Sequence, residues 1–193
     1  ECPSTQAYWV VDPLDGTTNF AAGIPYWAIS IARFVDGEPS EAFLDIPSLR
    51  QRIVAIRGQG AWRNQKRLTP ESRAAAGSSC VSLCSRSIRV LQKRPDQSFP
   101  GKIRLLGVAS LNLVSVAMGQ TAGALEATPK IWDLAAAWLV LTELECPLIW
   151  LGPHPAHLQP GRDLSEMGFP VVAAGSQKQL ERLAPWGESL LKG

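Results

Sequence analysis

The sequence lacks the features of secreted, membrane-spanning and nucleic-acid-binding proteins. Its four cysteines form no CxxC pair, and its longest apolar run in a helical pattern is residues 134–141, whereas a membrane-spanning helix needs about 20 apolar residues. Residues 1–4 contain no basic residue and no apolar stretch, so we expect no signal peptide. With 19 basic and 17 acidic residues the net charge is +2, which disfavours a nucleic-acid partner. These absences predict a cytoplasmic protein with free thiols and no membrane partner.

Histidine is scarce and methionine does not open the chain. The two histidines, His154 and His157, lie in a proline-rich segment, so we expect them to face solvent and find no Ser-His-Asp arrangement. A metal site that joins them to Cys146 is disfavoured. The chain begins without methionine and reaches a predicted strand almost at once, so we expect a fragment that lacks an N-terminal part.

The length and apolar content are those of a folded domain. A chain of 193 residues with 46% hydrophobic residues buries about 70% of its unfolded surface. The first third contains short apolar segments separated by turn residues, which predict a meander of antiparallel strands. The first of these strands is expected to end at Pro13, because proline lacks the amide that a ladder needs.

The second part of the sequence has a different pattern. A polar joint at residues 70–79 is followed by alternating helices and strands. This order predicts an α/β protein, an α+β layered sandwich, rather than a doubly wound sheet. The expected strands are residues 8–11, 26–34, 41–46, 52–56, 81–83, 102–106, 123–126, 147–151 and 171–174, and the expected helices are residues 88–93, 111–119, 132–144 and 177–191.

Residues 12–20, Asp-Pro-Leu-Asp-Gly-Thr-Thr-Asn-Phe, carry the strongest chemical signal. Asp12 and Asp15 follow a strand, and carboxylate oxygens are the ligands that Mg²⁺ prefers. Gly16 permits close backbone approach, and Thr17 and Thr18 supply N–H and hydroxyl donors for an anion. The alternative is an ordinary Asp-Pro-x-Asp-Gly turn followed by a threonine N-cap.

Two motifs resemble the signatures of the inositol monophosphatase family. One is Trp9-Val10-Val11-Asp12 continuing through Phe20, and the other is Trp132-Asp133 at the start of an Ala-rich helix. The resemblance extends over nearly the whole chain. It implies one domain over residues 1–193, with the metal loop and meander in residues 1–75 and an α/β half in residues 76–193. The family's N-terminal helices are missing.

The resemblance also implies roles for individual residues. Glu126 stands where the family often has an acid that binds substrate hydroxyls, although a strand-end glutamate is the plain alternative. Asp133 has the alternative of a helix N-cap, and Glu1 that of an arbitrary first residue. By resemblance, the metal ligands are Asp12, the Leu14 carbonyl, Asp15, Asp133 and Glu1; the phosphate is bound by Gly16 and Thr17; and Asp12, Asp15, Thr17 and Glu1 are the catalytic residues.

The sequence departs from the family pattern at three places. Val108 stands where a serine or threonine is usual after Gly107, which removes one substrate contact. Residues 143–146 read Glu-Leu-Glu-Cys in place of Glu-Ala-Gly-Gly, a change that we expect to alter a turn and not the metal site. Without the N-terminal helices, we expect an exposed apolar face that aggregates or binds partners.

The resemblance implies a Mg²⁺-dependent phosphatase that hydrolyses a small polyol or sugar-like phosphate monoester, such as inositol monophosphate. Metal ions would activate water and stabilise the leaving oxygen, with no covalent intermediate. A histidinol-phosphate phosphatase of the same family and a non-catalytic, metal-binding regulatory relative are the alternatives. The family also implies a homodimer for the intact protein.

Overall fold

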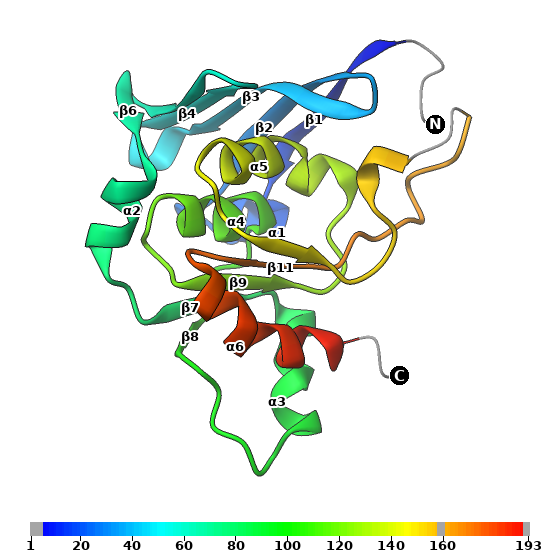
Figure 1. Ribbon diagram of the computed structural model, residues 1–193. Helices are drawn as coiled ribbons and strands as arrows, with labels where there is room; N and C mark the ends of the chain where they lie inside the picture. Colours follow the sequence, from blue (N-terminus) through cyan, green and yellow to red (C-terminus); the bar gives the residue numbers. More distant parts are fainter. Residues whose placement is uncertain (1–5, 158–160, 191–193) are drawn as a thin grey trace.

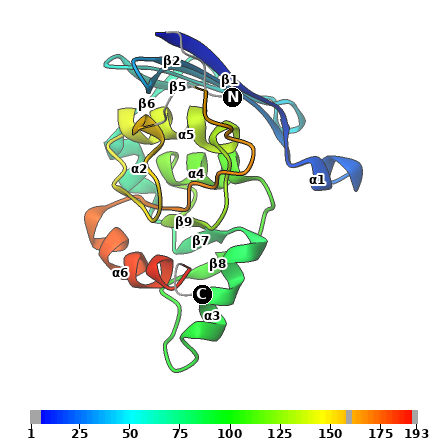
Figure 2. The ribbon, with the colours of Figure 1, turned by 90° about the vertical axis from the view of Figure 1, so that its right-hand side faces the viewer.

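Two β-sheets and two groups of helices stack in alternating layers in the computed structural model, which describes residues 6–157 and 161–190 (Figure 1). A first sheet covers helices α4 and α5, a second sheet lies beneath them, and α3 and α6 pack on its far side. Figure 2 shows the same layers from the side. This arrangement confirms the predicted layered α/β sandwich.

The first sheet is the predicted antiparallel meander, with strands in the order of the chain. Alternate residues of β2 are fully buried, as expected for a strand with one face on the core. The hairpin turn between β2 and β3 contains Asp36 and Gly37, both in the left-handed region. The strands are β1 (Ala7–Asp15), β2 (Ala28–Val35), β3 (Glu38–Ile46), β4 (Gln51–Ile56), β5 (Gly60–Arg63) and β6 (Lys66–Leu68).

One expectation about this sheet was wrong. Strand β1 does not end at Pro13 but continues to Asp15, with a register shift between Asp12 and Asp15. β1 is an edge strand of the sheet, and proline is tolerated at edges and bulges because no ladder hydrogen bond is lost there.

Helices α4 (Ala109–Ala117) and α5 (Ile131–Glu143) form the central layer. Leu134 and every residue from there to Leu141 are buried, because a helix between two sheets must be apolar on all sides. At its C-terminal end, the Glu143 carboxylate accepts hydrogen bonds from the amides of Gly58 (2.8 Å) and Gly60 (2.7 Å). The unusual residues 143–146 therefore lie at the opposite end of α5 from Asp133.

The second sheet is mixed, with strand order β10-β11-β9-β7-β8. β7 pairs in parallel with β8 and β9, whereas β11 pairs antiparallel with β9 and β10. Leu180, Leu183 and Leu190 are buried beneath it, as predicted. The elements are β7 (Cys80–Leu83), β8 (Lys102–Arg104), β9 (Gly123–Glu126), β10 (Leu148–Trp150), β11 (Val171–Ala174), α3 (Arg89–Lys93) and α6 (Gln177–Glu188).

The joint at residues 70–79 is more ordered than the sequence suggested. It contains helix α2 (Pro70–Ala76), whose N-cap Thr69 accepts a hydrogen bond from the Ser72 amide while the Ser72 hydroxyl accepts one from the Thr69 amide. Proline at the first helical position and a capping box are both helix-start signals. The interpretation of this segment as a polar joint overlooked these two signals.

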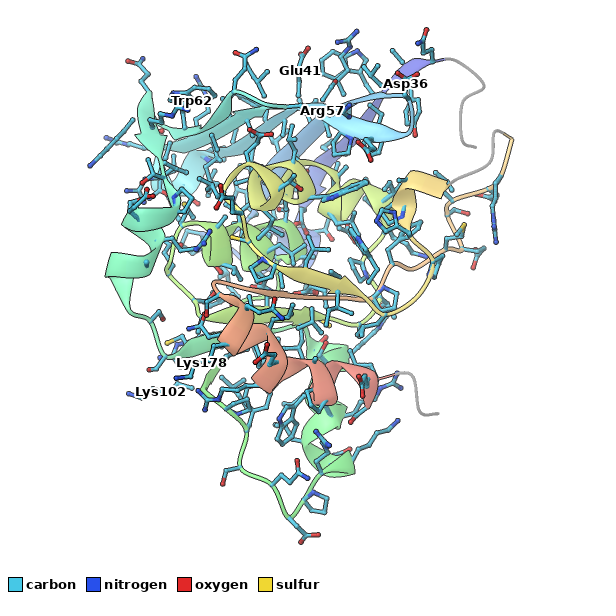
Figure 3. All side chains as sticks on the ribbon, viewed as in Figure 1. Asp36, Glu41, Arg57, Trp62, Lys102 and Lys178 are labelled. Carbon is cyan, nitrogen blue, oxygen red and sulfur yellow. The ribbon has the colours of Figure 1, made fainter. Side chains whose placement is uncertain are left out.

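The outer face of the first sheet is not covered by the described residues, and an apolar row crosses it between the ion pairs Arg33–Glu41 and Arg52–Asp45. Trp9 and Val11 of β1 are 60% and 47% exposed. The pairing registers place Val11 in one row across all six strands, which is completed by Ile31, Phe43, Val54, Trp62 and Arg67. Figure 3 shows Glu41 and Trp62 on this side of the sheet, away from α5. An exposed apolar face was predicted, and the structure shows exposed apolar residues here; that this face aggregates or binds partners stays a prediction.

Three further expectations concern single residue types. Cys80, Cys84 and Cys146 are free thiols, as expected, while Cys2 lies outside the described residues. His154 does not face solvent freely: it is half-buried and packs edge-on against Trp138 and Trp150. The side chain of His157 lies outside the described set. Within residues 6–157 and 161–190, no helix has the length and apolar character to cross a membrane.

Candidate active site

The bulge in β1 explains how Asp12 and Asp15 reach the same face of the sheet. Side chains alternate along a strand, so residues three apart point in opposite directions. In β1, Asp12 pairs with Ser30 and Asp15 with Ala28, which leaves two residues of β1 opposite one of β2. The extra residue turns both carboxylates inward, where they are 9% and 7% exposed. Bulges beside active sites commonly redirect a side chain in this way.

Helix α5 brings the third carboxylate to the same place. One oxygen each of Asp12, Asp15 and Asp133 lies within 4.8 Å of the others. Asp133 is the third residue of α5, and its Oδ2 accepts a hydrogen bond of 2.7 Å from the Lys130 amide. Asp133 is therefore not the N-cap, and it can complete a capping box with one oxygen while the other faces the cluster.

Backbone amides fix two of these carboxylates. The Leu14 amide donates to Asp12 Oδ1 (3.0 Å), and the Ser110 amide, in the first turn of α4, donates to Asp15 Oδ2 (2.7 Å). These bonds hold the acceptor oxygens in place before any ligand arrives. The role of the Leu14 carbonyl as a ligand stays a prediction, and Glu1 lies outside the described residues.

The electrostatics of this cluster favour a cation. Burial raises the pKa of Asp133 from 3.8 to about 7, with further increases from Asp15 and Asp12 and a decrease from the Lys130 amide. The pKa of Asp15 is also raised, chiefly by burial, against the opposing hydrogen bonds from Ser110. None of the ion pairs among the described residues involves this cluster. Buried carboxylates with oxygen-only donors and no basic partner fit a hard divalent cation such as Mg²⁺.

Glu126 lies at the end of β9, beside the cluster. It is 2% exposed, and its Oε1 accepts a hydrogen bond of 2.8 Å from Asn112 Nδ2. Burial raises its pKa from 4.5 to about 8; the Asn112 bond lowers it, while Asp15 and Asp133 raise it further. The raised pKa favours the protonated form of this carboxyl group, which can donate a hydrogen bond.

A pocket of about 240 Å³ borders the cluster at Asp133. Glu126 of β9 and Asp133 of α5 both line this pocket, so the two residues belong to one site. The sequence did not single out Cys84 and Arg86 from the end of β7, or Thr128 from the loop after β9. Among the residues that line this pocket are Cys84, Arg86, Ala109, Glu126, Thr128 and Asp133.

The segment predicted to bind phosphate lies directly after Asp15. Gly16 has a φ of +91°, and a Cβ at this position would lie 2.8 Å from Val108 Cγ2. Thr17 is exposed and begins the short helix α1 (Thr17–Ala21), which projects from the body in Figure 2. Val108 is fully buried and packs against Gly16. The residue that departs from the family pattern thus supports the loop through packing.

Asn19 joins this segment to the loop that carries Gly107. Its Nδ2 donates to the carbonyl oxygens of Tyr26 (2.9 Å) and Leu106 (2.8 Å). Gly107 has a φ of +76°, and a Cβ there would lie 3.2 Å from Asn19 Oδ1. Glycine is therefore required at this close approach.

Comparisons with known proteins agree with this architecture. The sequence profile of the inositol monophosphatase family matches residues 1–185. The chain therefore belongs to the inositol monophosphatase family.

Individual relatives add detail. The chain is 36% identical over 142 residues to an inositol-1-monophosphatase of Rhizobium meliloti (70% of this chain, 53% of the relative). It is 34% identical over 164 residues to a histidinol-phosphatase of Mycobacterium tuberculosis (78% and 63%). The crystal structure of extragenic suppressor protein suhB from Bartonella henselae has a TM-score of 0.75 at 26% identity, covering 98% of this chain and 72% of that one. The chain spans about half the length of the curated relatives that it matches first.

Proposed function

We propose that this protein is a Mg²⁺-dependent phosphatase that hydrolyses a small polyol or sugar-like phosphate monoester, of which inositol monophosphate is the leading example. The observation that carries the proposal is the cluster of Asp12, Asp15 and Asp133, whose oxygens lie within 4.8 Å of one another with no basic partner among the described residues. Asp12 and Asp15 are buried, and the partly buried Asp133 lines the pocket. Family membership supports the reaction class. A histidinol-phosphate phosphatase is the alternative within the same class.

In this proposal the three carboxylates hold the cation, with the Leu14 carbonyl and Glu1 as further predicted ligands. Bound Mg²⁺ supplies Lewis-acid polarisation of the phosphoryl group and a lowered pKa for a coordinated water. The chain itself contributes orientation. The amides of Leu14 and Ser110 fix Asp12 and Asp15, and the capping bond from Lys130 fixes Asp133.

The other predicted residues act on the substrate. Gly16 and Thr17 follow the cluster directly and offer amide and hydroxyl donors to phosphate oxygens. Glu126 lines the pocket next to Asp133, and in its protonated form it donates a hydrogen bond to a substrate hydroxyl. Asn112 holds the Glu126 carboxyl group in position from the opposite side.

The test is phosphate release from inositol 1-phosphate and from histidinol phosphate, with Mg²⁺, by the wild-type protein and the Asp12→Asn variant. We expect release from at least one substrate and its loss in the variant and after EDTA treatment. Asp36→Asn is the matched control, because Asp36 is an exposed turn residue with a φ of +54° that asparagine tolerates. Activity that persists in Asp12→Asn would refute the assignment.

A second candidate is a regulatory protein that binds metal without turnover. Val108 favours it, because an apolar side chain replaces a residue that the family uses toward substrate. The similarity to a protein described as an extragenic suppressor also supports it. Mg²⁺ binding by calorimetry without phosphate release would select this candidate. The homodimer and the cytoplasmic location stay predictions.

A further inference from the structure

The pocket beside the carboxylate cluster has a basic wall. Asp133, Glu126 and Ala109 line one part of the pocket, and Arg86 and Thr128 line another. Arg86 belongs to the 3-10 turn Ser85–Ile88, which follows strand β7. It is the single basic side chain among the described residues that line this pocket.

Arg86 is held in place by a hydrogen bond to its neighbour in the pocket wall, Thr128. Its Nη1 donates a hydrogen bond of 2.7 Å to Thr128 Oγ1, and Thr128 follows β9 on the way to α5. The bond bridges residues 42 positions apart in the sequence. A long side chain anchored in this way loses less rotamer freedom on binding a ligand than a free one.

Among the described residues, no carboxylate forms an ion pair with the remaining donors of Arg86. A guanidinium group has five N–H donors in a planar fork, and the contact with Thr128 occupies one of them. The ion pairs found in residues 6–157 and 161–190 join Arg33 to Glu41, Arg52 to Asp45 and Arg57 to Glu38, so Arg86 takes part in none of them. Glu126 and Asp133 line the same pocket, but neither forms an ion pair with Arg86. A guanidinium fork that lines a pocket and is not paired to a carboxylate of the protein matches the geometry of a bound carboxylate or phosphate.

The acidic residues and Arg86 therefore line different parts of the pocket. In the proposed function the scissile phosphate binds at the Asp12, Asp15 and Asp133 cluster, where the cation compensates its charge. Arg86 is not needed there. Its charge is available to a group on the part of the substrate that leaves, and it repels an ammonium group such as that of histidinol phosphate.

Resting on the proposed function, we infer that Arg86 is a specificity-determining residue that binds a second anionic group, a carboxylate or a second phosphate, on the leaving part of the substrate. Thr128 is its positioning residue. The preferred substrate class is then a small phosphate monoester that carries another acid, ahead of uncharged polyol phosphates and ahead of amine-bearing ones.

The kinetic test compares substrates that differ in one group. 6-Phosphogluconate and sorbitol 6-phosphate differ in a carboxylate against a hydroxymethyl group, and fructose 1,6-bisphosphate and fructose 1-phosphate differ in the second phosphate. We expect the wild-type protein to prefer the acidic member of at least one pair in kcat/KM. Arg86→Gln should lower kcat/KM for that member about tenfold, the loss expected for one charge-assisted contact at an exposed site. It should change the uncharged member by less than about threefold.

A binding test reads the same preference without turnover. 6-Phosphonohexanoate and 6-hydroxyhexylphosphonate are not hydrolysed, and titration calorimetry with the Mg²⁺-loaded protein gives their Kd values. 6-Phosphonohexanoate, which carries the carboxylate, should bind the wild-type protein about tenfold more tightly than 6-hydroxyhexylphosphonate. Arg86→Gln should abolish this difference in affinity. Thr128→Val should reduce it partly. Arg89→Gln is the matched control, because Arg89 is an exposed arginine three residues further on that does not line the pocket.

Several results would overturn the inference. These are equal kcat/KM values within both substrate pairs, a loss in Arg86→Gln that is the same for charged and uncharged ligands, or no measurable binding of either phosphonate. Failure of the proposed function looks different. In that case no substrate releases phosphate, while calorimetry still reports the carboxylate preference and its loss in Arg86→Gln.

Discussion

Removing the divalent cation and raising the pH should destabilise this protein, because the fold buries acids that prefer to be protonated. Burial raises the pKa of Asp133 to about 7 and that of Glu126 to about 8. In the unfolded chain both groups titrate near their ordinary values of 3.8 and 4.5. The folded pKa values lie above the unfolded ones, so the stabilisation is complete below about pH 4 and is lost as the pH rises through 7 and 8.

The size of the effect follows from the shifts. One pKa unit corresponds to about 1.4 kcal/mol, so Glu126, which is fully buried, contributes about 5 kcal/mol between pH 4.5 and 8. Asp133 is partly exposed, and solvent screening reduces its share to about 2 kcal/mol. The charge of Asp133 is one cause of the shift at Glu126, so the two contributions overlap. Glu126 alone accounts for a large fraction of the 5–15 kcal/mol that stabilises a typical domain.

The assay is urea unfolding, followed by tryptophan fluorescence, in EDTA and in Mg²⁺ at several pH values from 5 to 8. In EDTA the free energy of unfolding should fall as the pH rises, and Mg²⁺ should restore it most at pH 8. Glu126→Gln keeps an acceptor for Asn112 but removes the titrating group. In EDTA, the decrease in the free energy of unfolding between pH 5 and 8 should therefore be about 4 kcal/mol smaller in this variant than in the wild-type protein. The Asp36→Asn control should leave the curve unchanged. An EDTA curve that is flat or rises with pH in the wild-type protein would refute the reasoning.

Three further predictions concern backbone strain and the exposed face. Gly16→Ala should lower the thermal midpoint and the activity, because it adds a clash with Val108 to about 1–2 kcal/mol of left-handed strain; Gly23→Ala, with similar strain but open space, should cost only the strain. Glu145→Gly should raise the free energy of unfolding by about 1 kcal/mol, because Glu145 has a φ of +54°, and an unchanged urea midpoint would contradict this. Trp9→Lys should reduce light scattering by the concentrated 193-residue chain and change its stability by no more than about 0.5 kcal/mol, because Trp9 is 60% exposed; undiminished scattering would show that the outer face does not drive association.

Much of the fold was predictable from local patterns. Four strands of the meander and the helix after Trp132 were predicted from their apolar periodicity and are found near the expected positions, whereas the short strands β5 and β6 were not predicted. The continuation of β1 beyond Pro13 depends on its pairing with β2, which is a nonlocal property. The alternation rule applied to the sequence alone would have put Asp12 and Asp15 on opposite faces, and the bulge that unites them is visible only in the paired sheet.

The residues of the candidate site that lie within the two sequence motifs were predictable. The family motifs singled out Asp12, Asp15 and Asp133, and the structure brings them together. Arg86 and Thr128 belong to no motif, and their relation arises from two strands that end side by side. The environment of His154 was mispredicted for the same reason, since the tryptophans against which it packs come from α5 and β10.

The separation in sequence of the groups that form the carboxylate cluster has a consequence for folding kinetics. The bond from the Ser110 amide to Asp15 spans 95 residues, and that from Asn19 to the Leu106 carbonyl spans 87. The cluster therefore exists only after the first sheet has docked on α4 and α5. A cation that binds this late-formed arrangement stabilises the native state but not the folding transition state, so saturating Mg²⁺ should slow unfolding and leave the refolding rate unchanged. The lifetime of the native state, rather than the speed at which it forms, would then follow the concentration of the ion.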